Sequence, residues 1–407
     1  MRSLLLTAGL VVAATSSGII RLTTVPESSY VTLGQSYLFV GRFNGNSGVL
    51  IGDNMVLTAG HLFPGGAATV PFVLNGVTYQ VTNCMRDPLY NGGNIVNGHD
   101  FTIGRITTRV TTIAPVKMST GNAAGQTGVI AGYGITGVGT GGATTGNGVR
   151  RAGTNVIENF GDGPNCWWTD FDDGSATNNT LPGSLQAATA TEGHLGTGDS
   201  GGGLFMDIGG VPHLVGINSF NGRFDDNPNP LLFGSVSGFS KLSADGGWIE
   251  STLNSMNPGR VSGTIVLSNL SIPMTNTAAN VTIHDVTTDA QLETSASPIA
   301  IDGGWTISTA LRGNYRVRVK AGTWLSRSQV VNITNGWTRN IAQGNALNGD
   351  CNGDNIIDIA DYSLLASKFD LTSTSAGWDV RADLNRDNIV DIADYTILAT
   401  NFDAVGQ

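Results

Sequence analysis

The chain has 407 residues, more than one ordinary domain holds, so we expect two to four domains. Charged residues make up only 13% and 57 residues are glycine, which favours β-sheet with many turns over helical bundles. A net charge of -10 argues against nucleic acid and anionic membranes as partners.

Residues 1–17 have the layout of a secretory signal peptide. Arg2 supplies the positive charge, Leu4–Ala14 the apolar core, and Ala13–Ser17 the small residues for cleavage. A buried N-terminal helix is the alternative interpretation. No later apolar run reaches the roughly 18 residues that span a bilayer. We therefore expect an exported, soluble protein that is secreted or associated with the cell surface.

Cysteines are too few to build a disulfide scaffold. There are three, Cys84, Cys166 and Cys351, so at most one intramolecular disulfide can form. The sequence leaves open whether Cys84 and Cys166 are bonded, because it does not place their Cα atoms within bonding range.

Short strand-like runs fill residues 18–256 and are separated by Gly, Asn and Pro turns. Many short strands at this spacing predict an all-β barrel or sandwich. The expected strands include Ser36–Val40, Gly48–Ile51, Met55–Ala59, Ala68–Leu74, Val77–Val81, Thr112–Met118, Gly128–Tyr133 and Leu214–Ile217.

Three stretches of this region carry residues suited to a nucleophilic serine. Val56–His61 is an apolar run that ends in a histidine, and Asn97–Ile106 holds an aspartate ahead of alternating apolar residues. Gly196–Gly203 crowds small residues around Ser200. A serine nucleophile needs a sharp turn and nearby N–H groups that face a developing oxyanion. The N–H groups of Gly198 and Ser200 are the candidate donors.

These motifs, in the order His, Asp, Ser, resemble those of the trypsin/chymotrypsin-like serine proteases. Leu57–His61 matches the family's histidine motif closely, Gly198–Gly202 matches its serine motif without a change, and Asp100–Ile103 is a looser match to its aspartate motif. The resemblance implies two packed six-stranded barrels over residues 18–256, with the site between them, and a closing helix at Gly246–Leu253.

The resemblance also implies a role for each residue. Ser200 would attack a peptide carbonyl, His61 would accept the serine proton, and Asp100 would orient the imidazole. The N–H groups of Gly198 and Ser200 would bind the oxyanion. The implied substrate is a protein or peptide, and no cofactor is needed for catalysis.

A substrate pocket follows from the same resemblance. His194 lies six residues before the serine, where the family places the floor of its primary specificity pocket. Because this residue is not aspartate, a preference for Arg or Lys is not implied. Ser219 would hydrogen-bond to Asp100, and Phe220 and Asn221 would line the pocket and pair with the substrate backbone.

Activation in the family pairs a freed apolar N-terminus with the aspartate before the serine, here Asp199. Ile19 and Ile20 are the candidates, at 42 and 41 residues before His61. Two alternatives to a protease stay open: a non-catalytic binding protein on a protease fold, and an esterase that uses the same three residues. Hydrolysis of peptide amides would separate these interpretations.

Residues 257–345 alternate apolar and polar side chains with period two, which predicts a small antiparallel sandwich. The Asp302–Trp305 turn and the Gly313–Val317 run resemble the carboxypeptidase-regulatory or transthyretin-like spacers of secreted proteins. We interpret the segment as a spacer, with carbohydrate or protein binding as the alternative.

Residues 346–407 contain an internal duplication with an offset of 33 residues and 11 Asp without a Glu. Oxygen-bearing side chains fall at loop positions 1, 3, 5, 9 and 12, which is the spacing of a calcium loop. A backbone carbonyl would serve at position 7, and Asn355 and Asn388 stand at position 6. The candidate ligands for two Ca2+ ions are Asp350, Asn352, Asp354, Ile356, Asp358 and Asp361, then Asp383, Asn385, Asp387, Ile389, Asp391 and Asp394.

Each loop is followed by an expected helix, Ile359–Lys368 and Ile392–Asn401, with no helix before the loop. This layout resembles a type I dockerin, which implies a cohesin on a scaffold or cell-surface protein as partner. A calcium-stabilised module without a partner is the alternative. The expected fold is therefore mainly β: a signal peptide (1–17), a chymotrypsin-like double β-barrel (18–256), a β-sandwich (257–345) and a short α-helical calcium-loop module (346–407).

Overall fold

The computed structural model describes residues 5–6, 18–144, 146, 148–161, 163–256, 259–273, 277–309, 311–333 and 336–407. Apart from residues 5 and 6, the expected signal peptide lies outside the described residues. The chain divides into two compact units, the first made of residues 1–109 and 115–256 and the second of residues 110–114 and 257–407.

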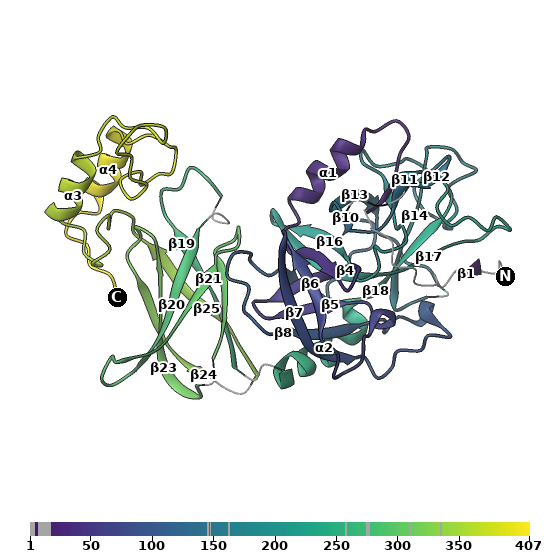
Figure 1. Ribbon diagram of the computed structural model, residues 1–407, viewed down its shortest axis with the longest axis horizontal. Helices are drawn as coiled ribbons and strands as arrows, with labels where there is room; N and C mark the ends of the chain where they lie inside the picture. Colours follow the sequence, from purple (N-terminus) through teal and green to yellow (C-terminus); the bar gives the residue numbers. More distant parts are fainter. Residues whose placement is uncertain are drawn as a thin grey trace. The chain divides into compact units, whose positions relative to one another are not determined.

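A closed barrel forms the first half of the first unit (Figure 1). Its strands follow one another in the order β3-β4-β5-β8-β7-β6, and apolar residues such as Val49, Leu57 and Ile103 are buried in the core beneath them. The strands are β3 (Val40–Phe43), β4 (Asn46–Gly52), β5 (Met55–Thr58), β6 (Val70–Leu74), β7 (Val77–Arg86) and β8 (Thr102–Ile106).

An eight-stranded sheet forms the other half, with the main order β13-β10-β16-β17-β18-β14 and with β1 and β9 paired to β17. A single bridge between Glu158 and Trp168 joins the regions of its two end strands. In place of the expected second six-stranded barrel, this half of the unit therefore has an open sheet whose two end regions meet at that bridge. The strands are β1 (Leu5–Leu6), β9 (Lys117–Met118), β10 (Thr127–Gly132), β13 (Arg151–Val156), β14 (Cys166–Asp170), β16 (Gly203–Ile208), β17 (Val211–Arg223) and β18 (Val236–Lys241).

A small additional sheet has the order β12-β11-β2-β15. Its strands are β2 (Ile20–Arg21), β11 (Thr136–Val138), β12 (Gly142–Thr144) and β15 (Gly193–His194). In this sheet, β2 at the start of the described chain pairs with β15, which precedes Ser200.

The described residues of the first unit also form two α-helices and two 3-10 turns: α1 (Glu27–Gln35), α2 (Leu242–Met256), η1 (Gly60–Leu62) and η2 (Ile95–Asn97). The expected closing helix lies inside α2, which begins four residues earlier. The expected strand Ser36–Val40 is wrong, because the chain leaves α1 through a turn and becomes extended only at Val40. Among the described residues, none of the helices combines the length and apolar character needed to cross a membrane.

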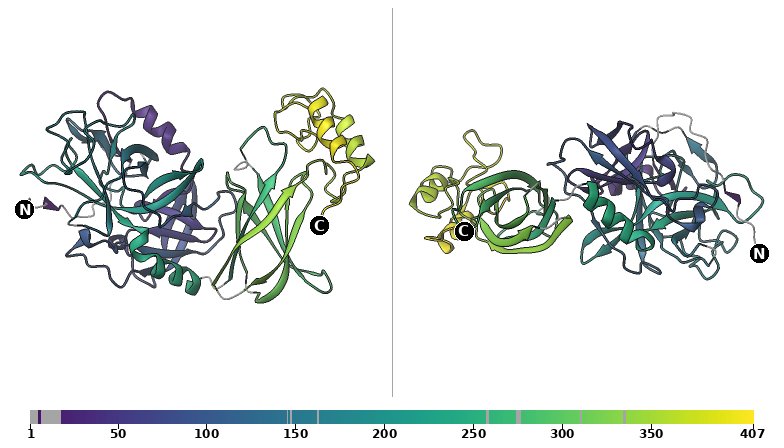
Figure 2. Two further views of the ribbon diagram at one scale, coloured as in Figure 1. Left: turned by 180° about the vertical axis from the view of Figure 1, so that it is seen from behind. Right: turned by 90° about the horizontal axis from the view of Figure 1, so that it is seen from below.

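Two sheets, β22-β19-β25 and β21-β20-β23-β24, face each other over one apolar core in the second unit (Figure 2). The expectation of a wholly antiparallel sandwich is wrong for one pair, because β19 and β25 run parallel. The strands are β19 (Gly259–Leu267), β20 (Ala278–Asp285), β21 (Gln291–Pro298), β22 (Gly304–Ser308), β23 (Gly313–Ala321), β24 (Arg327–Ile333) and β25 (Gly336–Ala346).

The duplicated segment folds into two loops that each run into a helix, α3 (Ile359–Ala366) and α4 (Ile392–Thr400). Cys351 and its counterpart Leu384 are both buried in the small core between the repeats, so Cys351 serves as an apolar core residue. All three thiols are free and buried, so Cys84 and Cys166 are not bonded.

Candidate active site

His61 and Asp100 meet at the rim of the closed barrel. His61 lies in η1 directly after β5, and Asp100 directly precedes β8, the strand paired with β5. The His61 Nδ1 atom lies 2.9 Å from Asp100 Oδ2, and the His61 backbone N–H donates to Asp100 Oδ1 at 2.7 Å. The Ser219 hydroxyl donates to Asp100 Oδ2 at 2.5 Å. Asp100 is fully buried, so these bonds fix its carboxylate and leave one imidazole nitrogen, Nε2, on the opposite side of the ring.

The loop that carries Ser200 packs directly against the segment leading to His61. The Ser47 backbone N–H donates to the Ser200 carbonyl at 3.0 Å, and Thr58 Oγ1 donates to the Ser47 carbonyl at 2.8 Å. Gly201 has a φ of +81°, and a Cβ there would lie 2.0 Å from Thr58 Oγ1. Only glycine fits both the left-handed conformation and this approach, which explains the small residues around the serine.

Carbonyl hydrogen bonds fix the Thr197–Gly198 and Asp199–Ser200 peptide groups. The Thr197 carbonyl accepts from the Ile135 N–H at 2.7 Å, and the Asp199 carbonyl accepts from the Gly202 N–H at 2.9 Å and from Asn218 Nδ2 at 3.1 Å. In a trans peptide the N–H points away from the carbonyl. The N–H groups of Gly198 and Ser200 therefore face away from these partners, and neither donates to another of the described residues.

Asp199 is buried and receives three backbone N–H groups. Gly134 donates to Oδ1 at 2.7 Å, and Gly196 and Ile19 donate to Oδ2 at 2.9 and 3.0 Å. Burial raises the pKa of Asp199 to about 6, although these donors act in the opposite direction. Of the two predicted activation residues, Ile19 is thus the one in contact with Asp199, whereas Ile20 belongs to β2.

His194, the predicted floor of the pocket, is fully buried. Its Nε2 lies 2.7 Å from the Pro230 carbonyl and its Nδ1 lies 2.7 Å from Ser237 Oγ, while its ring stacks on Phe171. Burial lowers the pKa of His194 to about 4. The imidazole is therefore neutral at physiological pH and places no charge under the pocket.

Phe220 and Asn221 are neighbours on β17, where the sequence predicts the wall of the pocket. The Phe220 ring packs edge-on against Trp168, and a Cβ on Gly238 would lie only 2.0 Å from the end of that ring. Asn221 Nδ2 donates to the Leu195 carbonyl at 2.8 Å, so its side chain joins β17 to the segment after β15.

A cluster of four carboxylates, Glu158, Asp170, Asp172 and Glu192, lies along β14 and its neighbours. Burial, followed by the charges of nearby carboxylates, raises the pKa of Glu158 to about 9 and that of Asp172 to about 7. Burial also raises the pKa of Glu192 to about 8, against hydrogen bonds from Thr189. No sequence motif predicts this cluster, because its members are spread over 35 residues without a recognisable spacing.

The two loops of the duplicated segment have donor sets that fit a hard cation. Position 6 is left-handed as expected, with φ of 73° at Asn355 and 75° at Asn388. Asp361 and Asp394 are fully buried, and burial raises the pKa of both carboxyls. Each also accepts backbone N–H groups from its own loop, for example from Asn352 to Asp361 at 2.9 Å. Among the described residues, no three carboxylates of one loop bring an oxygen each within 4.8 Å of one another.

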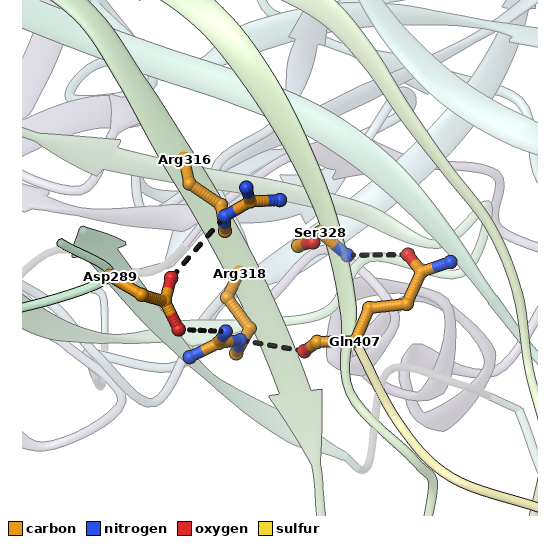
Figure 3. Close-up of a pocket in the computed structure, with 5 residues that line it drawn as sticks. All are labelled: Asp289, Arg316, Arg318, Ser328 and Gln407. Carbon is orange, nitrogen blue, oxygen red and sulfur yellow. Dashed lines mark hydrogen bonds and ion pairs between the residues drawn. The ribbon is translucent and has the colours of Figure 1, made fainter. Parts of the chain in front are cut away.

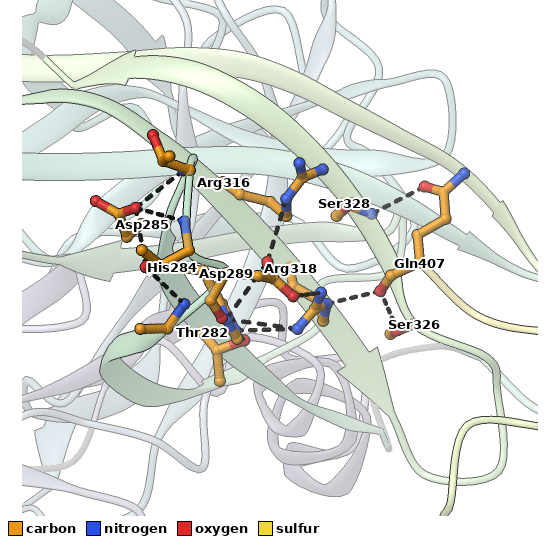
Figure 4. Close-up of polar contacts among 12 residues, drawn as sticks. Thr282, His284, Asp285, Asp289, Arg316, Arg318, Ser326, Ser328 and Gln407 are labelled. Carbon is orange, nitrogen blue, oxygen red and sulfur yellow. Dashed lines mark hydrogen bonds and ion pairs between the residues drawn. The ribbon is translucent and has the colours of Figure 1, made fainter.

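A cavity of about 450 Å3 lies in the second unit (Figure 3). Its arginines have internal partners: Asp289 lies 3.3 Å from Arg316 Nε and 3.0 Å from a terminal nitrogen of Arg318. Arg318 Nε and Ser326 Oγ each donate to the backbone oxygen of Gln407 at 2.6 Å (Figure 4). These contacts join the helical segment to the sandwich, and none of the predicted site residues lines the cavity.

Comparison with known proteins gives one family match. The family model described as Trypsin matches residues 31–242, just over half of the chain. No curated protein matches the chain. Among solved structures, neuropsin, a serine protease expressed in mouse brain, is 21% identical, covers 54% of this chain and 96% of its own, and has a TM-score of 0.39. Two interface mutants of a type II cohesin–X-dockerin complex from Acetivibrio cellulolyticus are 23% and 24% identical, each covering 36% of this chain and 97% of that chain with a TM-score of 0.30.

Proposed function

The chain belongs to the trypsin family, and from this membership we propose that it is a serine endopeptidase acting through Ser200, His61 and Asp100. The observation that carries the proposal is the bonding of His61 to the buried Asp100 beside the turn that presents Ser200. A histidine held in one tautomer by a carboxylate, with a serine on the adjoining loop, is the arrangement from which acyl transfer proceeds.

The mechanism follows from these contacts. His61 Nε2 accepts the Ser200 hydroxyl proton as Oγ bonds to the substrate carbonyl carbon. The carbonyl oxygen becomes an oxyanion and accepts from the N–H groups of Gly198 and Ser200. The C–N bond then breaks as His61 returns the proton to the leaving amine, and an acyl-enzyme remains. Water, deprotonated by His61, hydrolyses the ester and restores Ser200.

The pocket favours a small, uncharged residue before the cleaved bond. His194 is neutral, and the charge of the nearby Arg223 is paired with Asp225 at 2.5 Å. Asn221 reaches across to Leu195 and takes space that a large side chain would need. Cleavage before Ile19 would replace its amide by an ammonium next to Asp199, which would stabilise the ionised carboxylate.

For the remaining segments we propose export, a spacer and a calcium-dependent tether. The pattern of residues 1–17 supports export. Ile359 and Ile392 are each 64% exposed at equivalent positions of α3 and α4, and Tyr362 and Tyr395 are also exposed, which suits docking on a cohesin-like partner. When bound, Ca2+ would be held by the twelve predicted loop ligands and would offset their buried negative charge.

The first test measures peptide cleavage by the full chain in two forms, one beginning at Met1 and one at Ile19. Both are incubated with a mixed peptide library and a simple ester, as wild type, as Ser200→Ala and as the control Ser251→Ala, which alters an exposed helix serine. We expect Ser200→Ala to lower peptide cleavage at least about 1,000-fold and the control to leave it unchanged.

Cleavage that survives Ser200→Ala would refute the mechanism. Ester hydrolysis without peptide cleavage would favour the esterase. Inactivity of both forms on both substrates would favour a binding protein on a protease fold. Greater activity of the Ile19 form would support the proposed activation contact.

A further inference from the structure

Three ligand-type side chains converge in the first unit outside the residues used above: Asp87, His99 and Asp245. His99 Nδ1 lies 2.6 Å from Asp245 Oδ2 and 3.4 Å from Asp87 Oδ2. Among the described residues this is the one group of three or more His, Cys, Asp or Glu side chains whose ligand atoms all lie within 4.8 Å of one another.

The converging atoms are buried and lack hydrogen bonds. The side chains of Asp87, His99 and Asp245 are 1%, 12% and 5% exposed. Among the described residues, Asp87 Oδ2, Asp245 Oδ2 and His99 Nδ1 make no hydrogen bond of acceptable geometry. Buried polar atoms of native proteins nearly always have a partner. Three such atoms, whose contacts are ion pairs with one another, therefore form a candidate site for a cation.

The surrounding backbone holds the three groups in place. Asp87 uses its other oxygen, Oδ1, to accept from the Leu89 N–H at 2.8 Å, which leaves Oδ2 facing His99. The Asp87 N–H donates to the Phe101 carbonyl at 3.0 Å, and the Phe101 N–H donates to the His99 carbonyl at 3.0 Å. Asp245 comes from α2 at the one position of that helix with non-helical angles.

We propose that Asp87, His99 and Asp245 bind one divalent transition-metal ion of the zinc class. One imidazole nitrogen and two carboxylate oxygens are a common donor set for Zn2+, with ligand distances of about 2.0 to 2.2 Å. In tetrahedral geometry these distances separate neighbouring ligand atoms by roughly 3.3 Å. The His99–Asp87 spacing of 3.4 Å matches this value, and the His99–Asp245 spacing of 2.6 Å lengthens when the ion binds. Calcium and magnesium are disfavoured, because they select oxygen ligands over imidazole.

The ion would join three separate parts of the unit. Asp87 follows β7, His99 precedes β8 by three residues, and Asp245 lies in α2. His99 is also the neighbour of Asp100 and has a φ of +64°, an uncommon conformation for a side-chain-bearing residue. A metal bond to His99 would hold this turn in place. The site is structural, and it stands whether or not the proposed peptidase activity is correct.

The experiment measures metal content and stability of the full chain on a Ser200→Ala background, which prevents self-digestion. The protein is stripped with a chelator, saturated with Ca2+ to fill the loops, and titrated with Zn2+ alone. The variants are His99→Asn and Asp245→Asn, with His213→Asn and His61→Asn as controls. Asparagine suits position 99, because it tolerates a positive φ.

We expect one Zn2+ per chain by mass spectrometry after gel filtration, and a rise of about 5 °C in the Tm of the first unit. In His99→Asn and Asp245→Asn, we expect neither the bound Zn2+ nor the rise in Tm. In His213→Asn and His61→Asn, we expect both the bound Zn2+ and the rise in Tm. Loss with His61→Asn instead would place the ion in the catalytic site and overturn the proposal. Absence of Zn2+ binding by the parent, with a His99 imidazole that titrates in histidine-labelled NMR spectra, would identify a metal-free ion network and also overturn it.

Discussion

In the proposed peptidase, Asn221 is the residue that we expect to limit the choice of substrate. Its amide nitrogen donates to the Leu195 carbonyl at 2.8 Å, while its own strand position is opposite Ser237 on β18. Because the side chain joins two walls of the predicted pocket, removing it opens space. We predict that Asn221→Gly changes the ratio of two kcat/KM values, one for a substrate with Phe before the cleaved bond and one for the same substrate with Ala there. The ratio should rise about 10-fold or more.

The measurement compares kcat/KM for two peptides that differ only in that residue. Asn221→Ala serves as the matched variant, since it removes the amide but keeps a Cβ, and its ratio should lie between those of wild type and Asn221→Gly. An unchanged Phe-to-Ala ratio in both variants would show that Asn221 does not limit the pocket.

Glu158 makes the stability of the first unit depend on pH. Burial raises its pKa to about 9, so the folded state binds its proton more tightly than the unfolded chain does. This contribution is fully present below the ordinary glutamate pKa and is lost as pH rises through about 9. Glu158→Gln keeps an uncharged side chain at every pH. We predict that it stabilises the unit at pH 9 by on the order of 1 to 3 kcal/mol and has little effect at pH 4.

Thermal unfolding of the Ser200→Ala chain, with and without Glu158→Gln, at pH 4 and pH 9 tests the direction of this stability change. The control is Asp226→Asn, an exposed carboxylate in the loop after β17, which should shift the Tm equally little at pH 4 and pH 9. A Glu158→Gln chain that loses stability at pH 9 would mean that the ionised carboxylate has a partner the described contacts do not provide.

At the scale of elements, the sequence was informative where local patterns decide structure. Alternating apolar residues predicted most barrel strands, and the calcium-loop spacing predicted the left-handed Asn355 and Asn388. Helix α1 gave no such signal, because tertiary contacts hold it: Tyr30 donates to the Glu192 carbonyl at 2.8 Å and Arg150 donates to the Gly34 carbonyl at 2.7 Å. Partners 116 and 162 residues away cannot be read from a local pattern.

In the candidate site too, residues that lie in local motifs could be predicted and residues that only the fold brings together could not. The motifs around His61, Asp100 and Ser200 were visible because each needs particular residues next to one another. The group of Asp87, His99 and Asp245 was not, since its members come from three elements and share no spacing. The parallel pairing of β19 with β25 was likewise hidden, because period-two alternation does not report strand direction.

At the scale of the whole molecule, the helical segment and the sandwich form one unit. Lys320 Nζ lies 2.5 Å from Asp350 Oδ2, which links β23 to the first residue of the first loop. The Ser326 N–H donates to Asn355 Oδ1 at 2.8 Å, and the Asp350 N–H donates to the Thr323 carbonyl at 2.9 Å. Contacts of this kind couple the stability of the loops to that of the sandwich.

We therefore predict that Ca2+ removal destabilises the second unit as a whole and leaves the first unit unchanged. Buried Asp361 and Asp394 then keep uncompensated negative charge, so the Tm of the second unit should fall by about 5 °C or more. Calorimetry of the full chain would follow both transitions after chelation, chelator removal and addition of Ca2+ alone. The Asp361→Asn, Asp394→Asn double variant should not respond to Ca2+. A Ca2+-dependent Tm that persists in this variant would place the ion elsewhere, and a wild type without any Ca2+ response would refute the assignment of the loops.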